Sequence, residues 1–124
     1  IDRFDRVKDI VPFAGLVLLQ EDGTVEFLGA YPQWDFSRWQ DIEKVYGVYD
    51  KEWIKRSLYG IREDGSVIVN QYDGSTGQCM VTDHYRGWKL SDLYYVDGGV
   101  IGLTIDGKLV GDGIYENVDF SVFE

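Results

Sequence analysis

The chain has 124 residues, of which 15 are glycine and only 2 are proline, and 44% of the residues are hydrophobic. This length supports one substantial hydrophobic core and excludes two independent domains of ordinary size. The 12 basic and 22 acidic residues give a net charge of −10. This charge argues against direct binding of nucleic acid, because affinity for phosphate depends on lysine and arginine.

Nearly all of the predicted elements are β-strands. Apolar runs bounded by turn signals predict strands near residues 13–20, 24–30, 42–48, 57–62, 66–71, 93–97, 99–105 and 108–111. Two stretches, 37–44 and 49–56, carry weak helix signals without a sustained apolar stripe of helical period. We therefore predict a single all-β domain of repeated antiparallel hairpins spanning residues 1–124, in units of about 1–40, 41–90 and 91–124.

An Asp-Gly pair recurs at a fixed interval. Asp22-Gly23, Asp64-Gly65 and Asp106-Gly107 each lie 42 residues after the last. Periods of this length are typical of propellers, solenoids and repeat arrays. Each pair follows a strand-like run and precedes another, as a β-hairpin turn does, so hairpin turns are a better interpretation than calcium loops, which need several more oxygen ligands.

The apolar pattern also predicts the register of the hairpins. A two-residue loop at the first pair would set Leu19 opposite Glu26, whereas the three-residue loop 21–23 sets Leu19 opposite Val25 and Val17 opposite Phe27. Only the three-residue loop places apolar side chains opposite one another. We therefore expect a type I turn closed by a G1 bulge, with the glycine of each pair at positive φ.

Further repetition marks the linkers between hairpins. Tyr31, Asp35-Phe36-Ser37 and Trp39 return 84 residues later as Tyr115, Asp119-Phe120-Ser121 and Phe123. An Asp-Ile/Leu step also recurs, as Asp9-Ile10, Asp41-Ile42 and Asp92-Leu93. Its spacing to the following turn predicts that the middle unit has gained about ten residues near 46–56. The stretch from the second turn to Asp92-Leu93 is longer than its counterpart after the first turn, which predicts a second insertion at 73–87. Insertions in repeat proteins often form the binding face, so we expect specificity to reside in these two segments.

Aromatic side chains are the best candidates for binding. Trp39 and Trp88, which precede Asp-Ile/Leu steps, are expected in the core. Four aromatic residues are the candidate binding residues, with Trp34 and Trp53 expected to be exposed: Trp34, Tyr49, Trp53 and Tyr85. Tyrosine and tryptophan on a rigid β-scaffold form hot spots in protein interfaces and stacking surfaces for sugars.

The sequence shows no motif for catalysis, a metal or a cofactor. Cys79 has no second cysteine to pair with, and one cysteine and one histidine make no metal motif. His84 is expected to be an ordinary loop histidine, because no nucleophile elbow or phosphate-binding glycine loop accompanies it. The longest uncharged apolar run, 10–19, is too short to span a membrane. We expect no enzyme activity and no cofactor, and the sequence assigns no cellular compartment.

Several strings resemble a known repeat family. They are Gly15-Leu16 with Glu21-Asp22-Gly23-Thr24-Val25, then Trp39-Gln40-Asp41-Ile42, and Gly77-Gln78-Cys79-Met80-Val81 followed by Trp88 and Asp92-Leu93. Together they resemble the bacterial repeats similar to the regulator of chromosome condensation, in about three partial units. The resemblance implies β-propeller blades, and a function in binding proteins.

The family's domain has seven blades, and three units of about 40 to 50 residues cannot close such a ring. Three outcomes are open: a piece of a longer protein, self-association that completes a ring, or collapse into a sandwich or barrel. We expect a non-catalytic β-repeat scaffold that binds a protein partner. The alternatives are a carbohydrate-binding surface and an acidic decoy that occupies a basic partner.

Overall fold

The computed structural model describes residues 6–13, 15–29, 34–49, 55–96, 99–112, 115 and 118, with the backbone alone at 49, 55 and 96. Within them the chain forms strands and one short 3₁₀-helix, η2 (Tyr85–Gly87). The strands are β1 (Val7–Pro12), β2 (Leu16–Gln20), β3 (Val25–Leu28), β4 (Ile42–Tyr49), β5 (Lys55–Arg62), β6 (Val67–Asp73), β7 (Gln78–Thr82), β8 (Leu90–Val96), β9 (Gly99–Thr104) and β10 (Leu109–Asp112). The prediction of an all-β chain is therefore confirmed.

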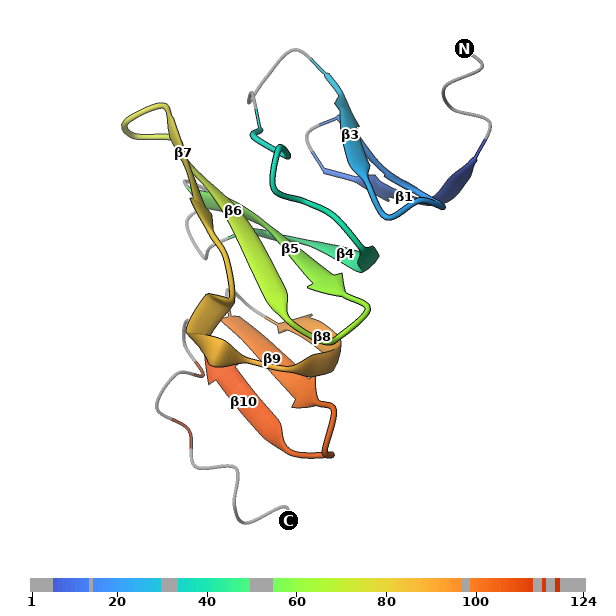
Figure 1. Ribbon diagram of the computed structural model, residues 1–124. Helices are drawn as coiled ribbons and strands as arrows, with labels where there is room; N and C mark the ends of the chain where they lie inside the picture. The colour runs from blue at the N-terminus through green and yellow to red at the C-terminus, as the bar shows by residue number, and fades with distance from the viewer. Residues whose placement is uncertain are drawn as a thin grey trace.

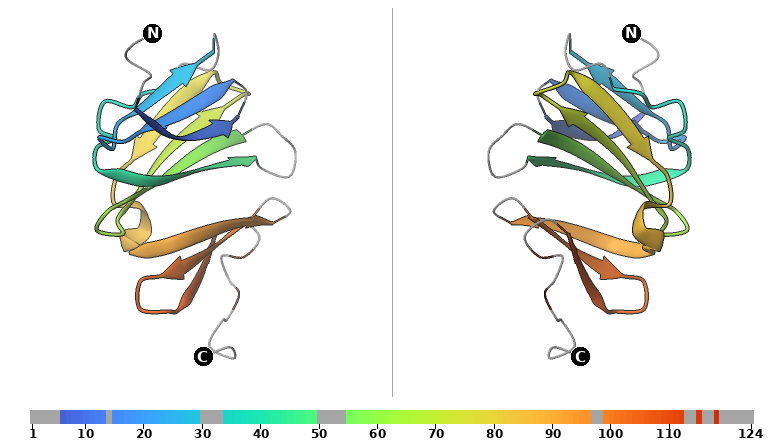
Figure 2. Two further views of the ribbon diagram at one scale, coloured as in Figure 1. Left: turned by 90° about the vertical axis from the view of Figure 1, so that its right-hand side faces the viewer. Right: turned by 90° about the vertical axis from the view of Figure 1, so that its left-hand side faces the viewer.

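Three antiparallel sheets form, each from strands consecutive in the sequence. The first sheet has the order β1-β2-β3, the central sheet β4-β5-β6-β7 and the third sheet β8-β9-β10. They lie in a stack, with the central sheet between the other two (Figures 1 and 2). None of the sheets in the described part of the chain closes on itself.

The three Asp-Gly turns have the predicted geometry. Leu19 pairs with Val25, Ile61 with Val67 and Leu103 with Leu109. The φ angles of Gly23, Gly65 and Gly107 are 84°, 88° and 90°. In the first turn the Gly23 amide donates to the Gln20 carbonyl at 3.0 Å, and the Gln20 amide donates to the Thr24 carbonyl at 2.9 Å. The other two turns repeat this pair of bonds, as a G1 bulge requires.

The structure also shows a repeat in the first strand of each sheet. The register of β1, β4 and β8 shifts by one residue after Val7, Ile42 and Leu90, respectively. These three residues are therefore equivalent, which corrects the alignment of the Asp-Ile/Leu steps. Asp41-Ile42 corresponds to Lys89-Leu90, whereas Asp92 corresponds to Lys44.

Two hydrophobic cores lie between the sheets, one on each face of the central sheet, in place of the single core expected from the chain length. The first core joins the first and central sheets: Phe13, Val17, Leu19, Val25, Trp39, Ile42, Val45, Leu58 and Ile68. The second joins the central and third sheets: Val48, Tyr59, Ile61, Val67, Val69, Leu90, Leu93 and Val100. Successive residues of β5 and β6 point into opposite cores, as the two-residue period of a strand requires.

Several local predictions were wrong. Strands β1 and β7 were not predicted, and the stretch from 37 to 44 holds no helix, because it makes a turn from Phe36 to Trp39 and then enters β4. Of the second helix candidate, residues 50–54 lie outside the described residues, and its two ends are in strands β4 and β5. Trp39 is 1% exposed, as expected, while Trp88 is half-buried against the second core.

Candidate binding surface

The loop that follows β7 has an unusual backbone. His84 and Arg86 have φ angles of 48° and 52°, in the left-handed region that costs an ordinary residue roughly 1–2 kcal/mol. The turn of η2 is closed by the Gly87 amide, which donates to the His84 carbonyl at 3.1 Å, and by the Trp88 amide, which donates to the Tyr85 carbonyl at 3.0 Å. A strained loop such as this persists only where its surroundings hold it in place.

One anchor of the loop is the ion pair between Arg62 and Asp83. The Arg62 Nη1 atom lies 2.7 Å from Asp83 Oδ1, and Arg62 also donates to the Ser66 hydroxyl at 3.2 Å and to the Arg38 carbonyl at 3.2 Å. The hydrogen bond from Arg62 is the main cause that lowers the pKa of Asp83. The start of the loop is thus tied to the end of β5.

The second anchor is Asp112, at the end of β10. Its carboxylate accepts a hydrogen bond from the Tyr85 hydroxyl and lies 3.1 Å from Arg86 Nη2 and 3.4 Å from the Tyr59 hydroxyl. The Tyr85 ring makes edge contacts with Tyr59 and Trp88, with centroids 5.8 and 5.4 Å apart. Burial is the main cause that raises the pKa of Tyr85. Tyr85 therefore orients the loop, while the neighbouring His84 side chain is 68% exposed.

The other predicted binding residues lie elsewhere. Trp34 is half-buried and packs against the first core, with its ring centroid 6.1 Å from that of Phe13 and 6.3 Å from that of Tyr72. The expectation that Trp34 is exposed is therefore wrong. Because Trp34 packs on the first core and Tyr85 on the second, the structure does not bring these two together. The Tyr49 side chain and the whole of Trp53 lie outside the described residues.

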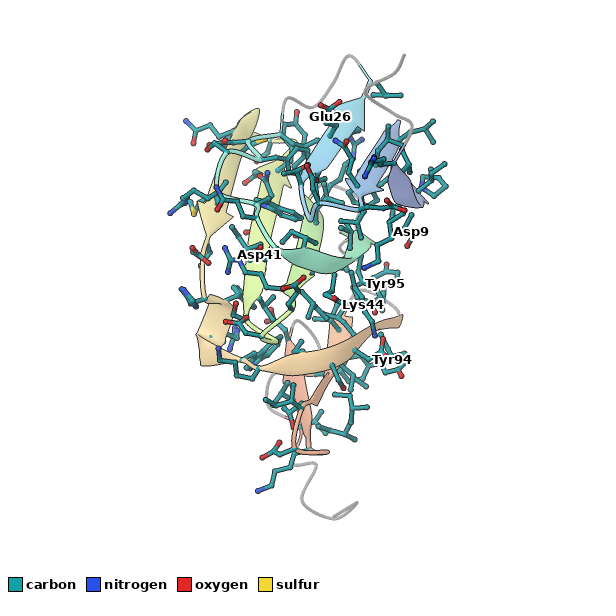
Figure 3. All side chains as sticks on the ribbon, turned by 45° about the vertical axis from the view of Figure 1, so that its right-hand side comes forward. Asp9, Glu26, Asp41, Lys44, Tyr94 and Tyr95 are labelled. Carbon is teal, nitrogen blue, oxygen red and sulfur yellow. The ribbon has the colours of Figure 1, made fainter. Side chains whose placement is uncertain are left out.

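A second surface, which sequence reasoning missed, follows the first strands of the sheets. Figure 3 shows Asp9, Lys44, Tyr94 and Tyr95 along one side of the molecule, on β1, β4 and β8. Tyr94 and Tyr95 are both exposed, at 51% and 41%. Two consecutive tyrosines in a strand point to opposite faces, so at least one of them faces away from any single core. That signal was present in the sequence.

Polar contacts join the central sheet to the third sheet along this side. The Lys44 ammonium donates to the Ser91 carbonyl at 2.8 Å and lies 3.6 Å from Asp92 Oδ2. The Tyr46 hydroxyl donates to Asp92 Oδ1 at 2.6 Å. This bond is the main cause that lowers the pKa of Asp92, while burial raises that of Tyr46. The two sheets are thus linked by polar contacts as well as by a hydrophobic core.

The potentially reactive side chains are dispersed. Among the residues that the structure describes, no three of His, Cys, Asp and Glu are grouped so that they could hold a metal ion. Cys79 is half-buried on β7, and burial raises the pKa of its thiol. The His84 Nε2 atom lies 3.9 Å from Asp83 Oδ1, which is too long for a hydrogen bond.

Comparison with known proteins adds no assignment. No protein-family model, curated protein or solved structure matches this chain. In the described part of the chain, no helix has the length and apolar character needed to cross a membrane.

Proposed function

We propose that this chain is a non-catalytic β-repeat scaffold that binds a protein partner through the loop of residues 83–88, here called the binding loop. The three sheets serve as blades of a propeller-like assembly, as the resemblance to the repeats similar to the regulator of chromosome condensation implies. Each blade supplies a rigid edge, and the loops between blades supply recognition.

The observation that carries the proposal is the strained backbone of the binding loop. Two non-glycine residues, His84 and Arg86, are kept at positive φ by anchors at Asp83 and Asp112. Strain of this kind is retained at functional sites, where a preorganised loop reduces the entropy lost on binding. The loop lies in the second predicted insertion and offers arginine and tyrosine, both common in interface hot spots.

The proposal is tested by photo-crosslinking from an extract of the source cells. A photoreactive residue replaces His84 in one preparation, and Met80, an exposed residue of β7 outside the loop, in a control preparation. We expect one defined polypeptide to crosslink from position 84 and not from position 80. Arg86→Ala should weaken the binding of that polypeptide at least tenfold, as loss of a hot-spot side chain does. Equal crosslinking from both positions would contradict the proposal.

A second candidate function is carbohydrate binding, which the exposed pair Tyr94 and Tyr95 favours. Exposed aromatic rings offer stacking surfaces to sugars. Affinity electrophoresis through a panel of soluble polysaccharides tests this, with Tyr95→Ala as the variant and Met80→Ala as the control. If the wild-type chain and the Met80 variant are retarded and the Tyr95 variant is not, the result favours carbohydrate binding. If no polysaccharide retards any of them, binding of a protein partner remains the proposal.

A further inference from the structure

Each sheet has two faces, and the 42-residue period assigns equivalent residues to each. The forward face is the one that, in the first two sheets, packs against the next sheet in the chain. In the first sheet it carries Val17, Leu19 and Val25, which enter the first core. One period later the central sheet carries Tyr59, Ile61 and Val67, which enter the second core. The third sheet carries the next members of the series, Ile101, Leu103 and Leu109, which belong to neither core.

Equivalent residues can be assigned in the same way to the rear face of each sheet, which packs against the preceding sheet. The central sheet uses Val45, Leu58 and Ile68 in the first core, and the third sheet uses Leu93, Val100 and Val110 in the second. The equivalent residues of the first sheet are Ile10, Leu16 and Glu26. Ile10 is 53% exposed and Leu16 40%. The forward face of the third sheet and the rear face of the first are thus the two halves of an interface that the chain forms twice internally.

The Asp-Gly turns show how successive units are joined. The Gly23 carbonyl accepts a hydrogen bond from the Ile42 amide at 3.0 Å, and the Gly65 carbonyl accepts one from the Leu90 amide at 2.8 Å. Each glycine is therefore close to the first strand of the next unit. A Cβ on Gly23 would lie 2.8 Å from the Asp41 Cα atom, whereas a Cβ on Gly107 would meet no described atom within 4 Å. The amide equivalent to those of Ile42 and Leu90 is that of Val7, at the start of β1.

One polar contact between sheets also has equivalent positions at the two ends of the stack. The Tyr46 hydroxyl of the central sheet donates to Asp92 of the third sheet at 2.6 Å. One unit further on, the residue equivalent to Tyr46 is Tyr94, and the residue of the first sheet equivalent to Asp92 is Asp9. Figure 3 shows both on the same side of the molecule, Asp9 on β1 and Tyr94 on β8. The two ends of the stack therefore carry complementary halves of this contact too.

We infer that the forward face of the third sheet binds the rear face of the first sheet of a second copy of this chain. The Gly107 carbonyl accepts the hydrogen bond of the second copy's Val7 amide, and Tyr94 donates to the second copy's Asp9. The contact is head-to-tail, so it leaves one free face at each end of a dimer and propagates to a closed ring or an open filament.

Three features weaken this contact relative to the internal ones. Glu26 occupies the position held by Ile68 in the central sheet and Val110 in the third, so docking brings a carboxylate into an apolar interface. Tyr115 already lies over Gly111, at one end of the forward face. Two chains that each carry a charge of −10 also repel each other, so association should strengthen as salt screens that repulsion.

The test is sedimentation velocity across a concentration series at about 0.15 M salt, where the Debye length is about 8 Å. We expect concentration-dependent association of the wild-type chain, and tighter association, by at least tenfold, for Glu26→Val. Leu103→Lys on the forward face and Ile10→Lys on the rear face should each abolish association. Near-ultraviolet circular dichroism checks that both variants keep the native fold.

Mixing gives the decisive measurement. The Leu103→Lys chain retains its rear face and the Ile10→Lys chain its forward face, so an equimolar mixture should form a 1:1 dimer and grow no further. A mixture that stays monomeric would overturn the inference, as would a wild-type chain and a Glu26→Val chain that are both monomeric at every concentration. Association that either variant retains alone would also overturn it. Arg86→Ala in the binding loop should leave association unchanged, so that failure here is distinguishable from failure of the proposed function.

Discussion

At the scale of single residues, comparison of two equivalent glycines distinguishes the free-energy cost of a positive φ from the cost of a steric clash. Gly23 and Gly107 have nearly the same φ, 84° and 90°. A Cβ on Gly23 would lie 2.8 Å from the Asp41 Cα atom, whereas a Cβ on Gly107 would meet no described atom. We expect Gly107→Ala to lower the free energy of unfolding by about 1–2 kcal/mol, the cost of the left-handed conformation alone. Gly23→Ala should cost more, because it also forces β4 away from the turn.

Urea denaturation of the two variants measures both costs. It is best done at low protein concentration, where self-association does not contribute to stability. Equal losses of unfolding free energy in the two variants would show that the close approach of Asp41 to Gly23 adds nothing to the cost of the substitution. A loss at neither site would contradict the positive φ of these turns.

The turn aspartates predict a dependence of stability on pH. The Ser66 hydroxyl and amide both donate to Asp64 Oδ1, at 2.7 and 2.9 Å, and these bonds lower the pKa of Asp64 to about 2. Because the folded pKa lies below the unfolded value of 3.8, the stabilisation is fully present above about pH 4. It is lost as the pH falls from there toward about 2.

Comparison of the wild-type chain with Asp64→Ala tests this dependence. The thermal midpoint of the variant should lie below that of the wild type at pH 7, and the two midpoints should converge as the pH approaches 2. A gap that stays constant over that interval would show that the serine contacts do not depend on the charge of Asp64.

The register of the hairpins could be predicted at residue level because alternation and turn chemistry are local. Leu19 opposite Val25 follows from a three-residue loop and from the need to bury apolar side chains together. The burial of Trp34 could not be predicted, because it depends on Phe13 and Tyr72, which are distant in sequence. The Asp112 anchor of Tyr85 is equally non-local.

At the scale of elements, the strands that escaped prediction have mixed sequences. Strand β7 pairs only with β6, and its residues are exposed or half-buried. Its apolar run, Cys79 to Val81, is shorter than the runs that predict strands. Strand β1 begins with Val7, Lys8 and Asp9, where the register shift interrupts the alternation. Both lie at sheet edges, where burial imposes less on the sequence than it does in the interior.

The repeat could be recognised from its turns, whereas its first strands were misaligned. Asp41-Ile42 looks like Asp9-Ile10 and Asp92-Leu93 in the sequence, but the register shifts of the first strands place Ile42 with Val7 and Leu90. Asp41-Ile42 precedes the one-residue shift in β4, whereas Asp9-Ile10 and Asp92-Leu93 follow the equivalent shifts in β1 and β8. A two-residue motif is therefore too short to fix the alignment of these strands.

At the scale of the whole molecule, the central sheet is the part that both cores share. Leu58 and Ile68 enter the first core while Tyr59 and Val67 enter the second, from adjacent positions in β5 and β6. Strand β5 also has a paired strand on each side. Exchange of its amides therefore requires the opening of both cores, and the slowest hydrogen exchange of the chain should be found in peptides covering 55–73.

A core substitution tests whether the three sheets unfold together. Leu58 is fully buried in the first core, so Leu58→Ala should cost about 2–5 kcal/mol. If the stack is one cooperative unit, exchange should accelerate by at least tenfold in β9 of the third sheet as well as in β5. Ile10→Ala, at an exposed position, should change stability by no more than about 0.5 kcal/mol. Acceleration confined to the first and central sheets would show instead that the third sheet folds and opens on its own. The stability of the third sheet would then be set by the second core and not by the chain as a whole.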